Sequence, residues 1–219
     1  MSWRELDKNI LENKYDHYSF DFWCTIAFSN PEFKNERCKY IISLSSNELL
    51  KEDIELAFTY ISNDYNKQME NGGKILKPVI LYKKVFEKLG LNNIDFQEVV
   101  LEIDKLFIKY PPLISSDFLN CYKKIKNNNS TISITSNTAY ISGDLIIEIL
   151  NQNLSDVSFN MTIFSDLVGV SKPSREIFEL VKIETKKLYQ KEVKILHIGD
   201  NPITDYSGPI LSGIDALLI

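Results

Sequence analysis

Apolar residues recur at helical spacing through the middle of this 219-residue chain, from about Asn30 to about Asn129. The clearest series is Leu49, Leu50, Ile54, Phe58 and Ile61. Positions three or four residues apart lie on one face of a helix, so this series predicts an amphipathic helix with a buried stripe. Residues that end or begin helices divide the region further, and they are Asn71-Gly72-Gly73, Pro78, Gly90, Pro111-Pro112 and Ser116. We therefore expect the middle of the chain to be a unit of successive helices.

Short apolar runs of strand length lie on both sides of this helical region. One run precedes Asp21, and the others alternate with helical stretches after residue 129. The expected strands are 132–136, 161–167, 193–198 and 216–219, and the expected helices are 141–150, 174–189 and 209–212, with another helix before about Asn13. Alternation of this kind is typical of a parallel sheet that carries helices on both faces. The pattern predicts an α/β fold with a helical insertion after its first strand.

Composition narrows the expected partners. Hydrophobic residues make up 44% of the chain and charged residues 25%, as in ordinary globular proteins, and the net charge of −5 leaves no basic surface for nucleic acid. The first residues lack the apolar stretch of a signal peptide, and no run approaches the roughly 18 apolar residues of a membrane span. The three cysteines, Cys24, Cys38 and Cys121, are typical of reduced thiols. We expect a cytoplasmic protein without nucleic-acid or membrane partners, and its oligomeric state stays open.

Polar side chains stand where three of the predicted strands end. They are Asp21, Ser136 and Asp200. The carboxyl ends of parallel strands meet at one edge of the sheet, where ligands of such folds bind. We therefore expect these side chains to share one site.

The first two of these positions suit covalent catalysis. A carboxylate such as Asp21 can attack phosphorus or an activated carbon, and the small Thr25 in the following turn can help to hold it. Ser136 and the adjacent Asn137 can hold a phosphoryl oxygen and the charge that it gains during transfer. Taken singly, an aspartate or a Ser-Asn pair after a strand is more often an ordinary turn.

Charged residues further along the chain extend this set. Lys172 stands at the entry to a predicted helix, where its ammonium group can neutralise crowded anions, although most lysines are solvated surface residues. Asp200 and Asp205 offer the oxygen ligands that Mg²⁺ prefers, although aspartates also cap helices. His197 lies inside a predicted strand, which favours a buried structural role over a catalytic one.

Four fragments in a fixed order resemble the haloacid dehalogenase superfamily of aspartate-nucleophile hydrolases. They are Asp21-Phe22-Trp23-Cys24-Thr25, Ile134-Thr135-Ser136-Asn137, Gly169-Val170-Ser171-Lys172-Pro173, and His197-Ile198-Gly199-Asp200 followed by Asp205. The resemblance covers residues 18–25 and 132–219. It implies a Rossmann-like α/β core of residues 1–27 and 130–219, and an inserted α-helical cap of residues 28–129.

The resemblance also implies a site for a small phosphorylated metabolite. Asp21 would be the nucleophile, with Lys172 and Ser136 as further catalytic residues. The residues implied to bind substrate are Ser136, Asn137, Lys172 and Trp23, and those implied to bind Mg²⁺ are Asp21, Asp200, Asp205 and the backbone carbonyl of Trp23. In this set Asp205 would act in support, by orienting a metal-bound water or by pairing with Lys172.

Trp23 departs from the pattern of the family's phosphatases, which have an aspartate there to protonate the leaving oxygen. Indole cannot exchange a proton at neutral pH. Three hypotheses follow: a substrate with a good leaving group, a proton from a cap residue, or an impaired site that serves as a binding module. Dehalogenases of the superfamily also have an aromatic residue there and use no metal, so a metal-independent C–X hydrolase is an alternative. The carboxylates of Asp200 and Asp205 favour magnesium, because they would repel Asp21 without a cation.

Overall fold

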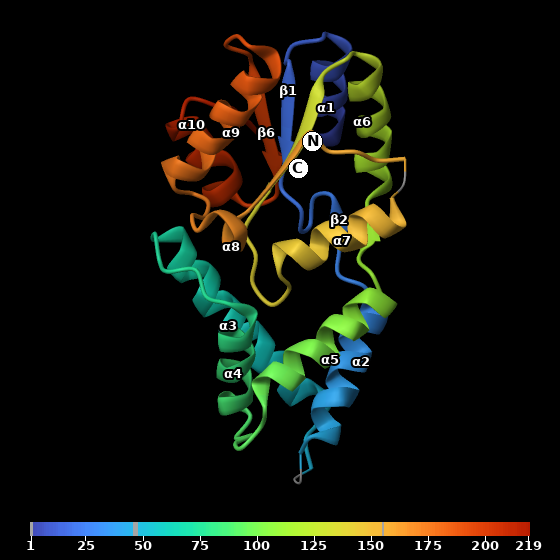
Figure 1. Cartoon of the computed structure of the whole chain (residues 1–219), viewed down its shortest axis with the longest axis vertical. Coiled ribbons are helices and arrows are strands. Elements are labelled where there is room, and N and C mark those ends of the chain that lie inside the picture. The colour runs from blue at the N-terminus through green and yellow to red at the C-terminus, as the bar shows by residue number, and fades with distance from the viewer. Residues whose placement is uncertain (1, 46–47, 155) are drawn as a thin grey trace.

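A parallel β-sheet lies at the centre of the computed structural model, which describes residues 2–45, 48–154 and 156–219 (Figure 1). Within these residues the sheet has five strands in the order β5-β4-β1-β6-β7. The strands are β1 (His17–Phe20), β4 (Thr131–Ser136), β5 (Met161–Phe164), β6 (Ile195–Gly199) and β7 (Asp215–Leu218). Each neighbouring pair is parallel, so the carboxyl ends of all these strands lie at one edge. The central strand, β1, is buried along its whole length.

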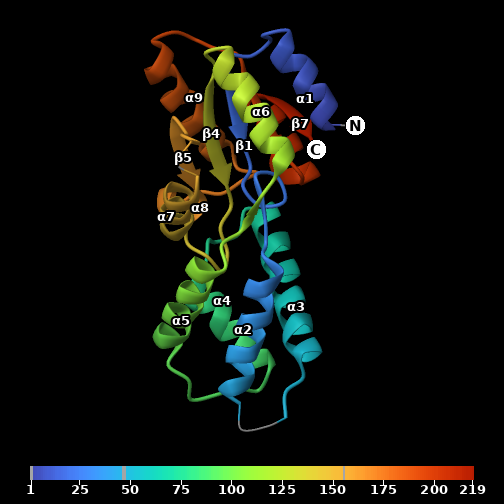
Figure 2. The same cartoon turned by 90° about the vertical axis from the view of Figure 1, so that its right-hand side faces the viewer.

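Helices cover both faces of this sheet, which confirms the predicted α/β fold (Figures 1 and 2). On one face, α1 (Ser2–Leu11) packs against α6 (Ser116–Asn127), and on the other α9 (Arg175–Tyr189) packs against α10 (Gly208–Leu211). The elements that follow the carboxyl ends of β4, β5 and β6 are α7 (Gly143–Asn153), α8 (Ser165–Val168) and the π-helical turn η1 (Pro202–Ser207).

A helical lobe lies next to the carboxyl edge of the sheet (Figure 1). It consists of α2 (Pro31–Ser43), α3 (Lys51–Glu70), α4 (Pro78–Lys88) and α5 (Phe96–Lys109). The bundle closes on itself, because α2 and α4 each pack against both α3 and α5. The two chain segments that join lobe and sheet pair as antiparallel strands, β2 (Ala27–Phe28) with β3 (Leu113–Ile114). No helix in the described part of the chain combines the length and the apolarity needed to cross a lipid bilayer.

The predicted breaks between the lobe helices are confirmed. α3 ends at Glu70, shortly before Gly72, whose φ of 75° is left-handed and favours a residue without a side chain. α4 begins at Pro78 and ends just before Gly90, whose φ is 71°. The cap of α6 is Ser115, one residue earlier than predicted, and its Oγ accepts a hydrogen bond from Phe118 N at 3.3 Å.

Other elements left too little pattern in the sequence. α2 buries only Phe33, Cys38 and Ile41 along its length, so its apolar spacing did not single it out. β2 and β3 are two residues long, which is too short for an alternating pattern. The run 161–167 was predicted to be one strand, but it divides into β5 and α8 at Ser165.

The division into a core of residues 1–27 and 130–219 and a cap of residues 28–129 stays a prediction. The helix α6 falls inside the range 28–129, yet it packs against α1 and β4 (Figure 2). The helical lobe itself therefore comprises α2 to α5, and α6 belongs to the layer that covers the sheet.

A fully buried histidine connects the central strand β1 to its neighbour β4. On β1, His17 places Nδ1 2.7 Å from Thr131 Oγ1 and Nε2 2.8 Å from Ser133 Oγ, both on β4. Burial lowers the pKa of His17 to about 3, because the charged ring would lose its hydration. The ring is therefore neutral in the folded protein at neutral pH.

We expect His17 to make the fold sensitive to acid. Its pKa is 6.5 in the unfolded chain and lower in the fold, so its contribution is complete above pH 6.5 and is lost as the pH falls toward 3. The loss is at most about 1.4 kcal/mol of unfolding free energy per pH unit. Urea unfolding between about pH 7 and pH 4 should give a shallower pH dependence for His17→Gln than for the parent protein, because glutamine does not titrate. Equal slopes would contradict this assignment.

Candidate active site

Asp21, Ser136 and Asp200 stand at the carboxyl ends of three adjacent strands. Asp21 follows β1, Ser136 is the last residue of β4, and Asp200 follows β6. Because β1 lies between β4 and β6, the strand order alone brings these side chains to one place. The structure thus brings together the three residues that the alternating pattern placed at one edge of the sheet.

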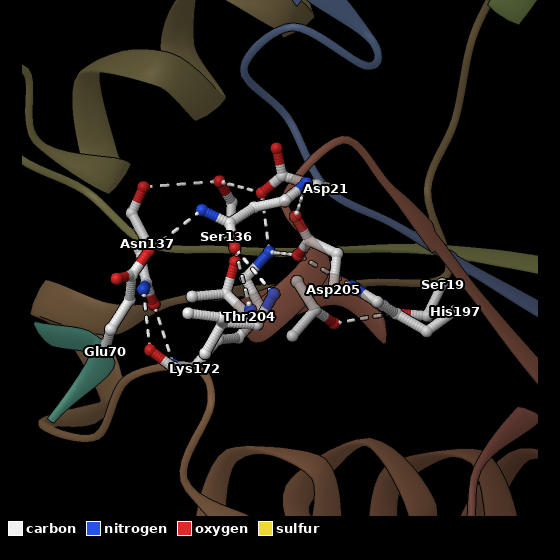
Figure 3. A network of polar contacts seen from close by, with 12 residues as sticks. Ser19, Asp21, Glu70, Ser136, Asn137, Lys172, His197, Thr204 and Asp205 are labelled. Carbon is white, nitrogen blue, oxygen red and sulfur yellow. Dashed lines mark hydrogen bonds and ion pairs between the residues drawn. The ribbon is translucent and has the colours of Figure 1, made fainter. Parts of the chain in front are cut away.

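Lys172 lies at the centre of the site (Figure 3). Its Nζ is 2.6 Å from Asp21 Oδ1 and 2.5 Å from Asp205 Oδ1, and only 1% of its side chain is exposed. Ser136 Oγ donates to the same oxygen of Asp21 at 2.9 Å. Oδ1 of Asp21 is thus held twice, whereas Oδ2 accepts no hydrogen bond within the described residues.

Asn137 fixes the loop that carries Lys172. Its Nδ2 donates to the carbonyl oxygen of Lys172 at 2.9 Å, and its Oδ1 accepts from Lys172 N at 2.8 Å. Asn137 also lines the cavity described below. The sequence suggested that Asn137 binds substrate, but the structure shows its side chain engaged with the backbone of Lys172.

Asp205 is held on the other side of Lys172 by a buried network (Figure 3). His197 Nε2 donates to Asp205 Oδ1 at 3.1 Å, and Asn201 N donates to Asp205 Oδ2 at 3.0 Å. His197 is fully buried, and its Nδ1 lies 3.0 Å from Ser19 Oγ. These contacts agree with the structural role predicted for His197.

Burial and charge act against each other on the ionisable groups of the site. Burial and the nearby Asp205 raise the pKa of Asp21 to about 7, although Lys172 opposes this rise. Burial would also raise the pKa of Asp205, but Lys172 and His197 outweigh it and hold that pKa below its usual range. Burial would lower the pKa of Lys172, but the two carboxylates outweigh it and raise that pKa. The pKa of Asp200 is raised by burial and by Asp205.

The acidic residues form a group that fits a hard cation. Asp21, Asp200 and Asp205 each offer one carboxylate oxygen, and these oxygens lie within 4.8 Å of one another. Three carboxylates face one ammonium group, so the site carries excess negative charge. Both oxygens of Asp205 already accept hydrogen bonds, which leaves Asp21 and Asp200 as the carboxylates free to bind a cation.

A cavity of about 310 Å³ opens above these residues, and the helical lobe forms part of its wall. All the site residues expected from the sequence line it: Asp21, Trp23, Ser136, Asn137, Lys172, Asp200 and Asp205. Of the lobe residues that the structure describes, those that line the cavity all belong to α3, namely Ser62, Tyr65, Asn66, Met69 and Glu70. A hydrogen bond from Asn201 Nδ2 to Glu70 Oε1, at 3.2 Å, joins the lobe to the loop after β6.

The residues of α3 were not found from the sequence, although their spacing carries a partial signal. Ser62, Asn66 and Glu70 are four residues apart and so form a polar stripe on one face of the helix. This stripe runs beside the buried Ile61, Tyr65 and Met69. A polar stripe beside a buried one is typical of any amphipathic helix, so the spacing places these residues on one face but does not show that this face lines a cavity.

Trp23 lines the cavity and also touches the lobe. Its ring lies 4.9 Å from that of Phe22 and 6.2 Å from that of Phe107 on α5, measured between centroids. The sequence suggested that Thr25 helps to hold Asp21, but Thr25 is fully buried and its Oγ1 has no partner within the described residues. That expectation was wrong, because the side chain of Thr25 is turned into the core.

Comparison with known proteins identifies the fold. No protein-family model matches the chain, and no curated protein matches its sequence. The HAD-hydrolase YfnB from Bacillus subtilis, solved bound to magnesium, is similar with a TM-score of 0.72 and 18% identity over 92% of this chain and 87% of that chain. L-2-haloacid dehalogenase from Xanthobacter autotrophicus, with chloropropionic acid covalently bound, is similar with a TM-score of 0.61 and 14% identity over 92% of this chain and 76% of that chain. A hydrolase from Streptococcus pneumoniae TIGR4 is similar with a TM-score of 0.54 and 18% identity over 93% of this chain and 91% of that chain.

These similarities cover 92–93% of this chain, so they extend into the helical lobe. The protein therefore has the fold of the haloacid dehalogenase-like hydrolases, as its four ordered fragments predicted.

We expect removal of the buried ammonium group to destabilise the fold strongly. Lys172→Met leaves Asp21 and Asp205 buried without a cation, which typically costs about 3–5 kcal/mol. The cost should shrink as the pH falls from about 8 to about 5, because protonation of Asp21, whose pKa is already raised, relieves the repulsion. Urea unfolding in EDTA measures both effects.

The matched control is Lys124→Met. Lys124 pairs with Asp7 at 2.7 Å, but 41% and 38% of the two side chains are exposed, so this pair contributes little. Equal losses for the two variants would show that Lys172 does not balance a buried charge.

Proposed function

We propose that this protein is a Mg²⁺-dependent hydrolase of small phosphorylated molecules with Asp21 as its nucleophile. One observation carries the proposal: Lys172 and Ser136 hold Oδ1 of Asp21, while Oδ2 has no partner within the described residues. A carboxylate held in this way has a fixed orientation and one oxygen left to attack phosphorus.

The reaction has two balanced steps. In the first, Asp21 Oδ2 bonds to phosphorus, and the bond from phosphorus to the leaving oxygen breaks with its electron pair. In the second, a water oxygen attacks the same phosphorus, the bond to Asp21 breaks, and inorganic phosphate leaves with the proton balance made up by solvent. Lys172 Nζ and Ser136 Oγ lie beside Asp21, where they stabilise the phosphoryl oxygens.

A cation fits the remaining charge of the site. Mg²⁺ held by Asp21, Asp200 and the carbonyl oxygen of Trp23 would supply positive charge against the phosphoryl oxygens. Burial and Asp205 raise the pKa of Asp21 to about 7, and a positive charge bound nearby would keep this nucleophile ionised at neutral pH. Asp205 acts in support, since its contacts with Lys172 and His197 keep the ammonium group in place.

Trp23 sets the leaving groups that the site accepts. Acid catalysis typically contributes about 10²- to 10⁴-fold, or roughly 3–5 kcal/mol of barrier, and indole supplies none of it. Acyl phosphates and aryl phosphates need no proton on the leaving oxygen, so we expect them to react fastest. The alternative proton source is Glu70, the one carboxyl group that the lobe places in the cavity within the described residues.

A dehalogenase-like hydrolase that acts at carbon is the second candidate. The aromatic Trp23 in the cavity favours it, as does the fold shared with the haloacid dehalogenase of Xanthobacter autotrophicus. The carboxylate of Asp200 beside Asp21 favours the phosphatase, because without a cation it would repel an attacking carboxylate.

We expect hydrolysis of acetyl phosphate and p-nitrophenyl phosphate that requires Mg²⁺ and stops with EDTA. Asp21→Asn should abolish turnover, since an amide oxygen is a poor nucleophile, and the fold should persist. Phosphate release assays measure this, with Glu52→Asn on the far end of α3 as the control for a lost charge.

The other outcomes separate the rival functions. Release of halide from 2-haloacids in EDTA would establish the dehalogenase instead. Binding of Mg²⁺ without turnover of either substrate class would indicate a binding module.

We expect Trp23→Asp to raise the turnover of alkyl phosphates, because it restores a proton donor two residues after the nucleophile. Acetyl phosphate should gain little, since its leaving group needs no proton. Trp23 packs on Phe22 and Phe107, so the variant should also melt at a lower temperature. The kcat/KM ratio between the two substrates measures the effect, and no change in that ratio for a folded variant would argue against this account of Trp23.

A further inference from the structure

A second cavity, which we call the side cavity, adjoins the candidate active site. It has a volume of about 560 Å³ and lies between α2, α3 and Tyr140. Ser62 and Tyr140 line both cavities, and Ser62 Oγ lies 3.5 Å from Tyr140 Oη. A ligand that extends from Asp21 past these two side chains would therefore enter the side cavity.

Arg37 is the main charged feature of the side cavity. Its guanidinium carbon lies 3.7 Å from the ring centroid of Phe58 and 5.3 Å from that of Phe33. Stacking on Phe58 fixes the plane of the guanidinium group and leaves its N–H edge for an acceptor.

One donor of that edge has no acceptor within the described residues. Arg37 Nε is buried without a hydrogen-bond partner. The nearby acids pair elsewhere, Glu36 with Lys39 at 2.6 Å and Glu55 with Lys51 at 3.6 Å. Neither carboxylate therefore satisfies Arg37 Nε, and a buried donor without a partner is the observation that points to a ligand.

Tyr82 lies beside Arg37 and is fully buried. Burial raises the pKa of Tyr82, and both the positive charge of Arg37 and a side-chain interaction of Arg37 with the Tyr82 hydroxyl oppose this rise. The hydroxyl therefore approaches the guanidinium group and is not itself a sign of a ligand. Arg37 Nε is the buried donor that stays without an acceptor among the described residues, whereas buried polar groups are normally bonded.

The chemistry of the acceptor that would bind there follows from the donors. A planar guanidinium fork matches a carboxylate, which accepts two parallel hydrogen bonds. Lys34 also lines the side cavity and adds positive charge, whereas the one acid there, Glu55, pairs with Lys51. The aromatic rings of Phe58 and Tyr140, 5.1 Å apart, leave an apolar wall for a short carbon chain.

We propose that Arg37 forms a subsite for a carboxylate at the far end of the substrate. This inference rests on the proposed function, because it places the phosphoryl group at Asp21 and the carboxylate at Arg37. The substrate class is then phosphorylated carboxylic acids, with Ser62 and Tyr140 beside the carbon chain that joins the two ends.

Binding of phosphonates tests this inference without turnover. Isothermal titration with Mg²⁺ present compares ω-phosphonoalkanoates of increasing length with alkylphosphonates of the same lengths. At one length the carboxylate should improve the affinity of the parent protein about tenfold or more. Arg37→Met should remove that advantage and leave alkylphosphonate binding unchanged.

Two further variants serve as controls. Arg37→Lys keeps the charge and most of the packing but loses the planar fork, so it should recover only part of the advantage; this variant decides the question if Arg37→Met does not fold. Arg175→Met, at an exposed arginine on α9 that pairs with Glu179, should keep the whole advantage.

The outcomes separate this inference from the proposed function. If alkylphosphonates bind but the carboxylate adds nothing at any length, or if the Arg37 variants keep the advantage, the subsite is refuted and the proposed function stands. If neither series binds, both proposals fail.

Discussion

The structure depends on one buried ionic contact, in which Lys172 lies between Asp21 and Asp205. Burying an ammonium group or a carboxylate without an opposite charge would strongly reduce the stability of the fold. The three charges offset one another, because the ammonium group attracts both carboxylates. The contact also joins the ends of distant chain segments, since Asp21 follows β1 and Asp205 lies in η1 after β6. Asn137 on one side and His197 on the other leave Lys172 little freedom. The orientation of Asp21, and with it the chemistry of the cavity, follows from this contact.

The helical lobe and the sheet contribute different residues to the two cavities. The charged groups that would act on a phosphoryl group all come from the sheet and its loops, whereas α2 and α3 shape the space beyond. Among the contacts that couple the two parts are those of Trp23 with Phe107 on α5 and of Asn201 with Glu70 on α3. Trp23 thus lines the cavity and at the same time forms part of the contact between sheet and lobe.

The parts of the fold and site that depend on strand ends were predictable, because alternation of strands and helices predicts a parallel sheet, and Asp21, Ser136 and Asp200 stand at the carboxyl ends of its strands. The order of the strands was not predicted. Lys172 was found through its sequence motif, since nothing in its local pattern shows that it is buried. The engagement of Asn137 with the Lys172 backbone and the orphaned Arg37 Nε depend on contacts across the chain that no local pattern encodes. The paired strands β2 and β3 are too short to show an alternating pattern of polar and apolar residues. The expected cytoplasmic location and the lack of nucleic-acid and membrane partners stay predictions.

The most direct test is to look for the phosphoryl group on Asp21 itself. The protein is mixed with acetyl phosphate and Mg²⁺, quenched in acid within one turnover and digested, and the peptides are sequenced by mass spectrometry. We expect the mass of one phosphoryl group on Asp21, absent from Asp21→Asn. Turnover that continues with the label on another residue, or with no label in a quench fast enough to catch a single turnover, would contradict the assignment of Asp21 as the nucleophile.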